Sequence, residues 1–593
     1  MKLEKTFEDC YATLDDTGFT IGNSRIERSW SLKGAVPQSL SLKNKDTGKE
    51  WFADKTPEGW LSAGEDAPAF IKTNVLSGKR TGTSAKTDTE DDLGFAAGHL
   101  IVEVELEYEQ IRLKWLHIIY PRLPVLRSRI LCKRKTRAAC SKSAQGLGQG
   151  HSGGLGQGLS GGLGQGLSGG ENPENFENTL TAAADPAPSG NKSYGGDYID
   201  MFPFLPHHCK WKAVGFRDVT DRHNNLVSTE EGLFYGGEKA SLSGNVLFVK
   251  DLLSEDGFMA IKEGPTPLAY QGDVSHDFEI FGNNIVTAGW GFGAEEWKGA
   301  DALSTDGSAV VLWEGNEEEA LTALQRYHRA LHTYRPERDA FVMCNTWGDR
   351  SKSVTINEDF IKRELSIAKR LGISCYQIDY GWQEAASQGG IEGYYNANPN
   401  YWDINKKGFP GGFRPIVEAA ENSNVNMGLW FSPDSSGDFC NWEKDAEVLT
   451  DLHKKYGIKA FKLDAVNIRS KKGEENLYRM MRKVVRETNG EVSLNLDITA
   501  QARSGYFGRT QYTSFFLENR YTDWHNYYPH WALRNLWMLS KYYPTFRLQV
   551  EFPNVNRNKG LYEGDPLAPS VCGIEYAFAV TMFSNPLAWM TLT

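Results

Sequence analysis

Carboxylates and tryptophans recur near the carboxyl ends of the strands predicted in the second half of the chain, with few His or Cys among them. Two carboxyl groups can cleave a glycosidic bond, because one protonates the leaving oxygen while the other acts as a nucleophile or a base. Tryptophan faces pack on the C–H surface of a sugar, and charged groups hold its hydroxyls. The pattern therefore favours carbohydrate chemistry at Trp347, Asp379, Tyr380, Trp382, Trp430, Lys462, Asp464, Asp497, Arg503, Glu518, Arg520, Asp523, Trp524 and Glu551.

A metal site is the competing interpretation of the same carboxylates. Many catalytic metal sites use imidazole or thiolate ligands, which these strand ends do not supply. The eight cysteines are scattered, with no CxxC pair. We predict no metal and no cofactor, although an all-oxygen Mg²⁺ site stays open.

Alternating strands and helices must position these side chains. From residue 339 to 593, eight strand-like runs alternate with helical stretches, several of which close with Gly. Eight such repeats over about 250 residues match the size of a (β/α)8 TIM barrel. We predict this barrel for 339–593, ending at its eighth strand, after a linking helix over 316–338.

The polarity of the strands predicts which face lines the barrel. In the fourth strand, Phe461 and Leu463 point one way while Lys462 and Asp464 point the other. The third, fifth and seventh strands alternate in the same manner. Because the apolar face must pack on the outer helices, the polar face is expected to line the interior, whose C-terminal end carries the active site in such barrels.

The sequence pattern of the first half of the chain predicts antiparallel sheet. Short alternating runs separated by turn signals predict a large β-sandwich over 1–315. Residues 143–170 hold 13 of the 60 glycines in a repeated unit close to LSGGLGQG. Such a composition buries too little apolar surface to fold, so we predict a flexible insert over 143–192.

Composition excludes several partners. The 593 residues carry a formal charge of −11 with no basic stripe, which disfavours nucleic acid. No stretch of about 20 apolar residues predicts a membrane span. The N-terminus lacks the apolar run of a signal peptide, so we expect a cytoplasmic protein. A homo-oligomer stays open.

Five motifs carry a resemblance to a known family. They are NTWGD at the first barrel strand, IDYGW at the second, GLWFSP at the third, FKLDAVN at the fourth and ENRYTDW at the sixth. Over residues 335–593 the chain resembles glycoside hydrolase family 36 and its clan, the retaining α-galactosidases and α-N-acetylgalactosaminidases. The strand-rich half is similar to that family's N-terminal β-sandwich, less specifically.

The resemblance implies that Asp464 is the nucleophile. Lys462 lies two residues away on the same strand face, and a neighbouring cation favours the ionised carboxylate that a nucleophile needs. The alternative is an Asp merely paired with Lys inside a barrel.

The resemblance also implies that Asp523 is the acid/base, with Trp524 supplying apolar surroundings that raise its pKa. Strand parity raises a difficulty. Phe516, Glu518 and Arg520 share one face, and Asp523 falls on the other if the strand is unbroken. Glu518 is therefore a rival, unless it pairs with Arg520 in support.

For the sugar subsite, the resemblance implies that Asp379 binds the hydroxyls at positions 4 and 6. It implies Trp347 and Trp430 as walls and Lys462 on ring hydroxyls. The remaining candidate contacts are Tyr380, Trp382, Asp497, Arg503, Arg520 and Trp524. Asp379 could instead be structural, and Trp382 and Trp430 could be core residues.

The sequence also departs from the family. Tyr380 follows Asp379 where the family carries two adjacent aspartates, Ser432 stands where glutamate is common, and the fifth strand lacks a Cys- and Gly-rich loop. The sequence thus predicts a retaining hydrolase that cleaves terminal α-linked galactose from an oligosaccharide or glycoconjugate. The alternatives are an α-N-acetylgalactosaminidase or other α-hexosidase of the clan, a non-catalytic carbohydrate-binding homologue, and an oxygen-ligated metal enzyme.

Overall fold

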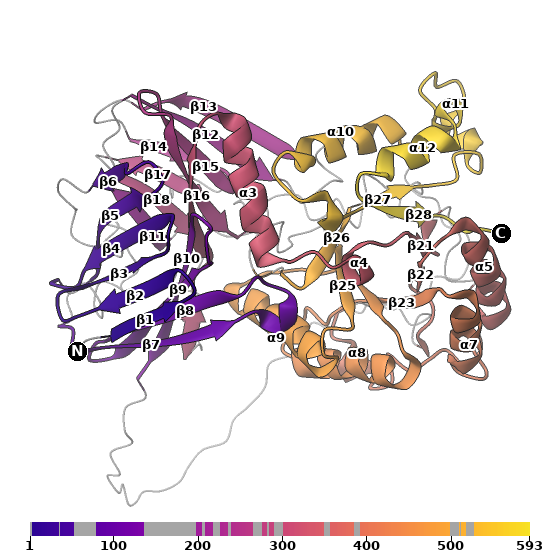
Figure 1. Cartoon of the computed structure of the whole chain (residues 1–593). Helices are drawn as coiled ribbons and strands as arrows, with labels where there is room; N and C mark the ends of the chain where they lie inside the picture. Colours follow the sequence, from indigo (N-terminus) through magenta and orange to yellow (C-terminus); the bar gives the residue numbers. More distant parts are fainter. Residues whose placement is uncertain are drawn as a thin grey trace, which may run out of the picture. The chain divides into compact units, whose positions relative to one another are not determined.

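A computed structural model describes most of the chain (Figure 1). The described residues are 3–34, 36–52, 79–135, 197–203, 208–216, 226–234, 239–264, 276–281, 284–289, 301–348, 356–384, 392–497, 509, 511–517 and 527–593. The insert predicted over 143–192 lies outside them. So do five site candidates, namely Arg503, Glu518, Arg520, Asp523 and Trp524.

The N-terminal half is built from three antiparallel sheets. A six-stranded sheet runs in chain order through β1 (Leu3–Phe7), β2 (Cys10–Leu14), β3 (Gly18–Gly22), β4 (Ile26–Ser31), β5 (Gln38–Asn44) and β6 (Glu50–Phe52). A four-stranded sheet has the order β11 (Asp197–Pro203), β18 (Asn284–Gly289), β17 (Phe278–Phe281) and β14 (Ala240–Leu242).

The third sheet has ten strands. Its order is β13 (Val227–Leu233), β12 (Cys209–Phe216), β15 (Val246–Asp251), β16 (Asp256–Glu263), β20 (Gly307–Glu314), β10 (Val125–Arg134), β9 (Ile111–Ile119), β8 (His99–Glu107) and β7 (Gly82–Glu90), and β19 (Ala302–Ser304) pairs with β10.

The alternation of apolar and charged residues explains how these sheets pack as a sandwich. In β8, Leu100, Val102 and Val104 are buried, whereas Glu103 on the other face pairs with Lys114 of β9 at 3.0 Å. The buried faces of different sheets meet in one core. Trp30 of β4 contacts Trp115 of β9, for example, with ring centroids 5.4 Å apart. The predicted β-sandwich is confirmed.

Helix α3 (Glu317–Leu331) lies within the linking helix predicted over 316–338 but ends at Leu331, before the barrel begins. Asn316 caps it by accepting from the backbone N–H of Glu318, while the Glu319 side chain accepts from the backbone N–H of Asn316. Its buried face includes Leu324 and Tyr327. A short helix, α4 (Pro336–Asp339), follows before the first barrel strand.

Eight parallel strands close into a barrel, as predicted. They are β21 (Met343–Asn345), β22 (Cys375–Ile378), β23 (Asn426–Phe431), β24 (Ala460–Leu463), β25 (Ser493–Asp497), β26 (Thr513–Leu517), β27 (Leu548–Phe552) and β28 (Asn585–Trp589). Strand β28 pairs with β21, so that Met343 lies opposite Leu587 and the sheet has no free edge. The fold is a β-sandwich followed by a TIM barrel.

Helices surround the strands (Figure 1). The main ones are α5 (Glu358–Leu371), α7 (Arg414–Ser423), α8 (Trp442–Tyr456), α9 (Lys471–Glu487), α10 (Pro529–Ser540) and α12 (Ile574–Thr581), with short helices α6 (Tyr394–Ala397) and α11 (Pro569–Cys572). The largely apolar run over 570–583, which on pattern alone favours one helix, is divided between α11 and α12. Gly573 between them adopts φ 82°, which breaks the helical path. Within the described ranges, no helix is long and apolar enough to cross a membrane.

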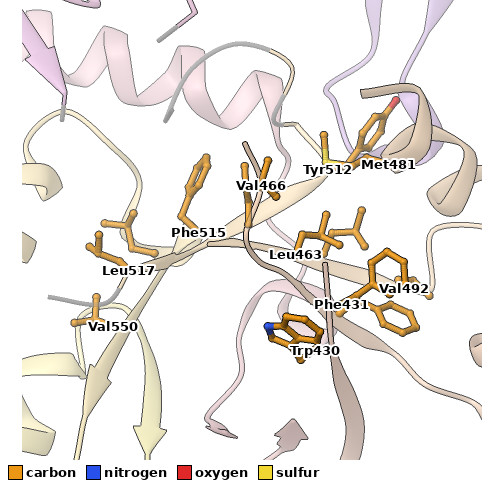
Figure 2. Close-up of a cluster of buried hydrophobic side chains, with 14 of the residues drawn as sticks. Trp430, Phe431, Leu463, Val466, Met481, Val492, Tyr512, Phe515, Leu517 and Val550 are labelled. Carbon is orange, nitrogen blue, oxygen red and sulfur yellow. The ribbon is translucent and has the colours of Figure 1, made fainter. Parts of the chain in front are cut away.

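The outer face of the barrel strands is apolar, as their parity predicted. Leu463, Phe515 and Val550 belong to a buried cluster that also includes Met481 of α9 (Figure 2). The inner face is more mixed than predicted. A second cluster joins Phe516, Leu587 and Trp589, with Met343, Cys375 and Ala460. The interior is therefore polar along β24, β25 and part of β22, but apolar where β26 and β28 face it.

Candidate active site

The ammonium group of Lys462 is the centre of the polar part of the barrel. Its Nζ lies 3.4 Å from an Oδ2 atom of each of three carboxylates, those of Asp379, Asp464 and Asp497. The Lys462 side chain is 2% exposed, and on its other side Nζ lies 4.2 Å from the ring centroid of Phe516 and 4.9 Å from that of Trp589. Both rings add cation–π attraction to the ion pairs.

Strand β24 ends at Leu463, directly before Asp464, whose carboxylate is held at both oxygens. Its Oδ2 accepts from the indole N–H of Trp430 at 2.9 Å, and its Oδ1 accepts from the backbone N–H of Ala465 at 2.6 Å. Ala465 adopts φ 51°, a left-handed conformation that is uncommon outside glycine, so the chain leaves the barrel in a sharp turn. The Asp464 side chain is 21% exposed, more than its acidic neighbours.

Asp379 is buried at the end of β22 and enclosed by donors. Its Oδ2 accepts from Asn345 Nδ2 at 2.8 Å, its Oδ1 accepts from the backbone N–H of Tyr380 at 2.8 Å, and its own N–H donates to Thr346 Oγ1 at 2.9 Å. Burial raises the pKa of Asp379 above its ordinary value, while the Lys462 cation opposes that rise. Each oxygen of the Asp379 carboxylate thus accepts a hydrogen bond, which fixes the orientation of the group.

Aromatic rings form a wall beside the carboxylates. The rings of Tyr380 and Trp430 meet edge to face, with centroids 5.2 Å apart. Trp382 Nε1 donates to the carbonyl of Trp430 at 2.8 Å, and the Trp382 ring stacks on Trp402 at 5.7 Å. Trp382 is fully buried, which suits a support for Trp430 better than a sugar contact. Trp347 is half-buried at the end of β21.

The structure brings together most of the candidates that it describes. Lys462, Asp464, Asp379, Asp497 and Trp430 lie within direct contact of at least one other member of the group. Tyr380 joins the group through its backbone N–H to Asp379 and its ring on Trp430, and Trp382 joins it through Trp430. The five candidates outside the described residues, which include both acid/base rivals, stay predictions.

Three contributors were missed from the sequence. Asn345 sits in the NTWGD motif and donates to both Gln377 Oε1 and Asp379, and parity on the first strand could have placed it inside. Phe516 and Trp589 share the inward parity of their strands, and that parity is the signal that could have found them.

This arrangement can support nucleophilic substitution by a carboxylate. Asp464 is the most exposed of the three acids, the Lys462 cation favours its ionised form, and two donors fix its orientation. Asp379 offers a buried acceptor for hydroxyls, and the aromatic wall offers an apolar face.

Comparison with known proteins bears on this geometry. No family model matches the chain. Alpha-galactosidase Mel36A of Lactobacillus acidophilus is 27% identical over 177 residues, which cover 28% of this chain and 22% of that relative. The match thus spans less than a quarter of the curated relative's length.

Solved structures match over nearly the whole chain. A GH36 α-galactosidase from Geobacillus stearothermophilus, in complex with 1-deoxygalactonojirimycin, gives a TM-score of 0.58 at 10% identity, covering 97% of this chain and 83% of that one. The fold is that of the GH36 α-galactosidases. The α-galactosidase from Lactobacillus brevis agrees, with a TM-score of 0.57 at 10% identity over 97% and 80% of the two chains. The resemblance to GH36 seen in the motifs is confirmed.

Proposed function

We propose that this protein is a retaining glycoside hydrolase that cleaves terminal α-linked galactose-type residues through a covalent glycosyl-enzyme. The observation that carries the proposal is the Asp464 carboxylate, ordered by Trp430 and Ala465 and placed 3.4 Å from the Lys462 ammonium. The GH36 fold and the sequence similarity to an α-galactosidase support the choice of sugar.

In the proposed first step, an oxygen of Asp464 bonds to the anomeric carbon while the bond from that carbon to the aglycone oxygen breaks. The acid/base gives its proton to the departing oxygen. In the second step, water attacks the anomeric carbon, its proton passes to the acid/base, and the ester bond to Asp464 breaks. We assign the acid/base to Asp523 by the family resemblance, with Glu518 as its rival.

Residues around the nucleophile would hold the sugar. Asp379 is proposed to accept from the hydroxyls at positions 4 and 6, because its carboxylate is buried and already oriented by Asn345 and Tyr380. Trp430 and Trp347 would form the walls of the subsite. The proposed division of the chain is a sandwich over 1–315, a linker over 316–338 and a catalytic barrel over 339–593.

The substrate is proposed to be an oligosaccharide. Variants of the Geobacillus stearothermophilus enzyme have been solved with raffinose and with stachyose, both of which are therefore natural test substrates. Another α-hexosidase of the clan is a second candidate, because Tyr380 follows Asp379 where the family carries a second carboxylate, and the Tyr380 ring packs edge to face on Trp430.

A panel of aryl α-glycosides tests the proposal. Galactose, N-acetylgalactosamine, glucose and xylose are compared on the parent and on Asp464→Ala, with thermal melts to check folding. We expect the galactoside to be cleaved fastest and the variant to lose at least about 10³-fold in kcat, as when a nucleophile is removed elsewhere. A correctly folded parent that cleaves none of the four glycosides would refute hydrolysis. An active Asp464→Ala would refute the nucleophile.

A further inference from the structure

Asp497 is the acid of the site that lies deepest. It is the last residue of β25, and its side chain is 0% exposed, compared with 21% for Asp464. Leu463 and Leu496 lie opposite each other in the parallel register of β24 and β25. The residues that follow them are Asp464 and Asp497, so the two carboxylates leave neighbouring strands side by side.

Two like charges on neighbouring strands repel each other unless a cation lies between them. Lys462 Nζ fills this position, at 3.4 Å from Asp464 Oδ2 and 3.4 Å from Asp497 Oδ2. The third distance, to Asp379, has the same value. An ammonium group carries three N–H donors, the same number as the carboxylates around it. The nucleophile therefore shares its cation with two other acids.

The remaining inward groups set the electrostatic surroundings of this cluster. Glu551 of β27 shares the inward parity of Gln549, which contacts Met343 inside the barrel, and Glu551 is itself buried. Strand β23 contributes the neutral Trp430, and β26 and β28 contribute the rings of Phe516 and Trp589. Three carboxylates thus surround the Lys462 ammonium, and Glu551 is a further buried carboxylate with inward parity.

We propose that Asp497 is a positioning residue that acts through Lys462 and does not contact the sugar. By holding the ammonium 3.4 Å from both carboxylates, it prevents a close ion pair with Asp464 that would reduce the reactivity of the nucleophile. When Asp464 becomes a neutral ester, Asp497 and Asp379 still hold the cation in place for the return of the carboxylate. This proposal rests on the proposed hydrolase function.

The pH dependence of kcat/KM for an aryl α-galactoside tests the proposal, since its acid limb reports the pKa of the nucleophile in the free enzyme. Asp497→Asn removes a negative charge beside Asp464. The free-energy cost of ionising Asp464 then falls, and the Lys462 cation is shared among fewer carboxylates. The pKa of Asp464 should therefore fall, and the acid limb should move to lower pH by about one unit, the scale of the effect of a single nearby charge. Asp497→Glu, which keeps the charge, should stay close to the parent.

Asp434→Asn is the matched control. Asp434 is a fully buried carboxylate just after β23, but its partners are the backbone N–H groups of Gly393 and Ser436 and the amide of Asn441. Its variant should leave the acid limb in place. An active parent whose acid limb does not move in Asp497→Asn, or moves equally in Asp434→Asn, would overturn the role of Asp497 without touching the hydrolase proposal.

A crystal structure of the parent with bound galactose tests the same proposal without any variant, which matters if Asp497→Asn fails to fold. We expect Lys462 Nζ to stay within 4 Å of Asp497, with no sugar hydroxyl within hydrogen-bonding distance of that carboxylate. A hydroxyl bonded to Asp497 would make it a substrate contact and refute the positioning role. A parent that cleaves no α-glycoside would instead refute the proposed function itself.

Discussion

The indole N–H of Trp430 donates to Oδ2 of Asp464 across a distance of 2.9 Å. The two residues lie on neighbouring strands, and the register that pairs Phe431 with Leu463 brings them together. Trp430 is in turn held by Trp382, which donates to its carbonyl. The aromatic wall therefore also fixes the acid that is proposed to attack the sugar.

Replacing Trp430 with Phe should separate these two roles. The ring wall remains, but the proposed nucleophile loses a hydrogen bond of the charged type, worth about 1.5–3 kcal/mol. We expect kcat/KM for an aryl α-galactoside to fall about 10- to 100-fold. Trp402→Phe is the control, since the same atoms are removed beside Trp430 without a bond to Asp464. Equal losses in both variants would argue for a packing effect alone.

Azide rescue should identify the acid/base. With an activated aryl leaving group the first step needs little acid assistance, so removal of the acid/base slows mainly the second step, in which azide can replace water without needing a base. We expect azide to accelerate Asp523→Ala and to yield an α-galactosyl azide, because azide displaces Asp464 from the β-linked glycosyl-enzyme, whereas Glu518→Ala should not respond. The reverse result would give the role to Glu518. A structure that resolves both proposed catalytic carboxyls should then place them about 5 to 5.5 Å apart.

Asp379→Asn should alter the choice of sugar. The amide cannot accept at both positions where the carboxylate accepts, and its N–H₂ group faces the donors Asn345 and Lys462 if it takes the place of Oδ2. We expect kcat/KM for the α-galactoside to fall roughly 100-fold, and the preference for galactose over its 4-epimer glucose to shrink. The check is the ratio of rates on the two aryl glycosides. An unchanged ratio would leave Asp379 with a structural role only.

Asp445 gives a prediction for stability. It is buried in α8 and accepts from the hydroxyls of Tyr394 and Tyr395 and from the backbone N–H of Asp434, which ties α6 to the loop after β23. Burial raises the pKa of Asp445 from 3.8 to about 7. The folded state then binds more protons than the unfolded state between those values, so the stability contributed by this group falls as pH rises through that window.

Thermal melts at pH 4 to 8 check this behaviour. Asp445→Asn cannot titrate, so the difference in Tm between parent and variant should change steadily across that range. Tyr395→Phe removes one donor, and with it a hydrogen bond worth about 1 kcal/mol, while the titrating group remains. If the Tm values of the parent and of Asp445→Asn change with pH in parallel, the raised pKa of Asp445 is contradicted.

Deleting residues 143–170 should leave catalysis unchanged. Strand β10 ends at Arg134 and β11 begins at Asp197, and both belong to sandwich sheets. We therefore expect kcat/KM within about twofold of the parent, measured on the aryl α-galactoside. A large loss of kcat would show that the insert contributes to the site.

Local patterns predicted the helices and strands well because each has one face in a core. The period-2 alternation around Lys462 and Asp464 correctly placed both in the barrel interior, and the Gly372 and Gly457 stops correctly ended α5 and α8. The Gly573 break was missed because the apolar run on either side of it favours one continuous helix.

The interior contacts were harder to predict, because they depend on how strands far apart in sequence stagger. Nothing near Lys462 in the sequence indicates that its ammonium reaches Asp379, Asp497 and the ring of Trp589. The left-handed turn at Ala465 was also invisible, since Ala has no preference for it. Parity identifies the face of a residue, whereas register and strand stagger determine its partners.

Closure of the barrel has a consequence for biosynthesis. The N–H of Phe341 donates to the side chain of Asn585, which follows it by 244 residues, and Met343 pairs with Leu587. Contacts of such long range form slowly, because the intervening chain must first be ordered. On the ribosome, the sheet would remain open until β28 emerges, and Lys462 would lack the ring of Trp589 until then. The proposed catalytic centre would therefore be completed only when β28 joins the sheet.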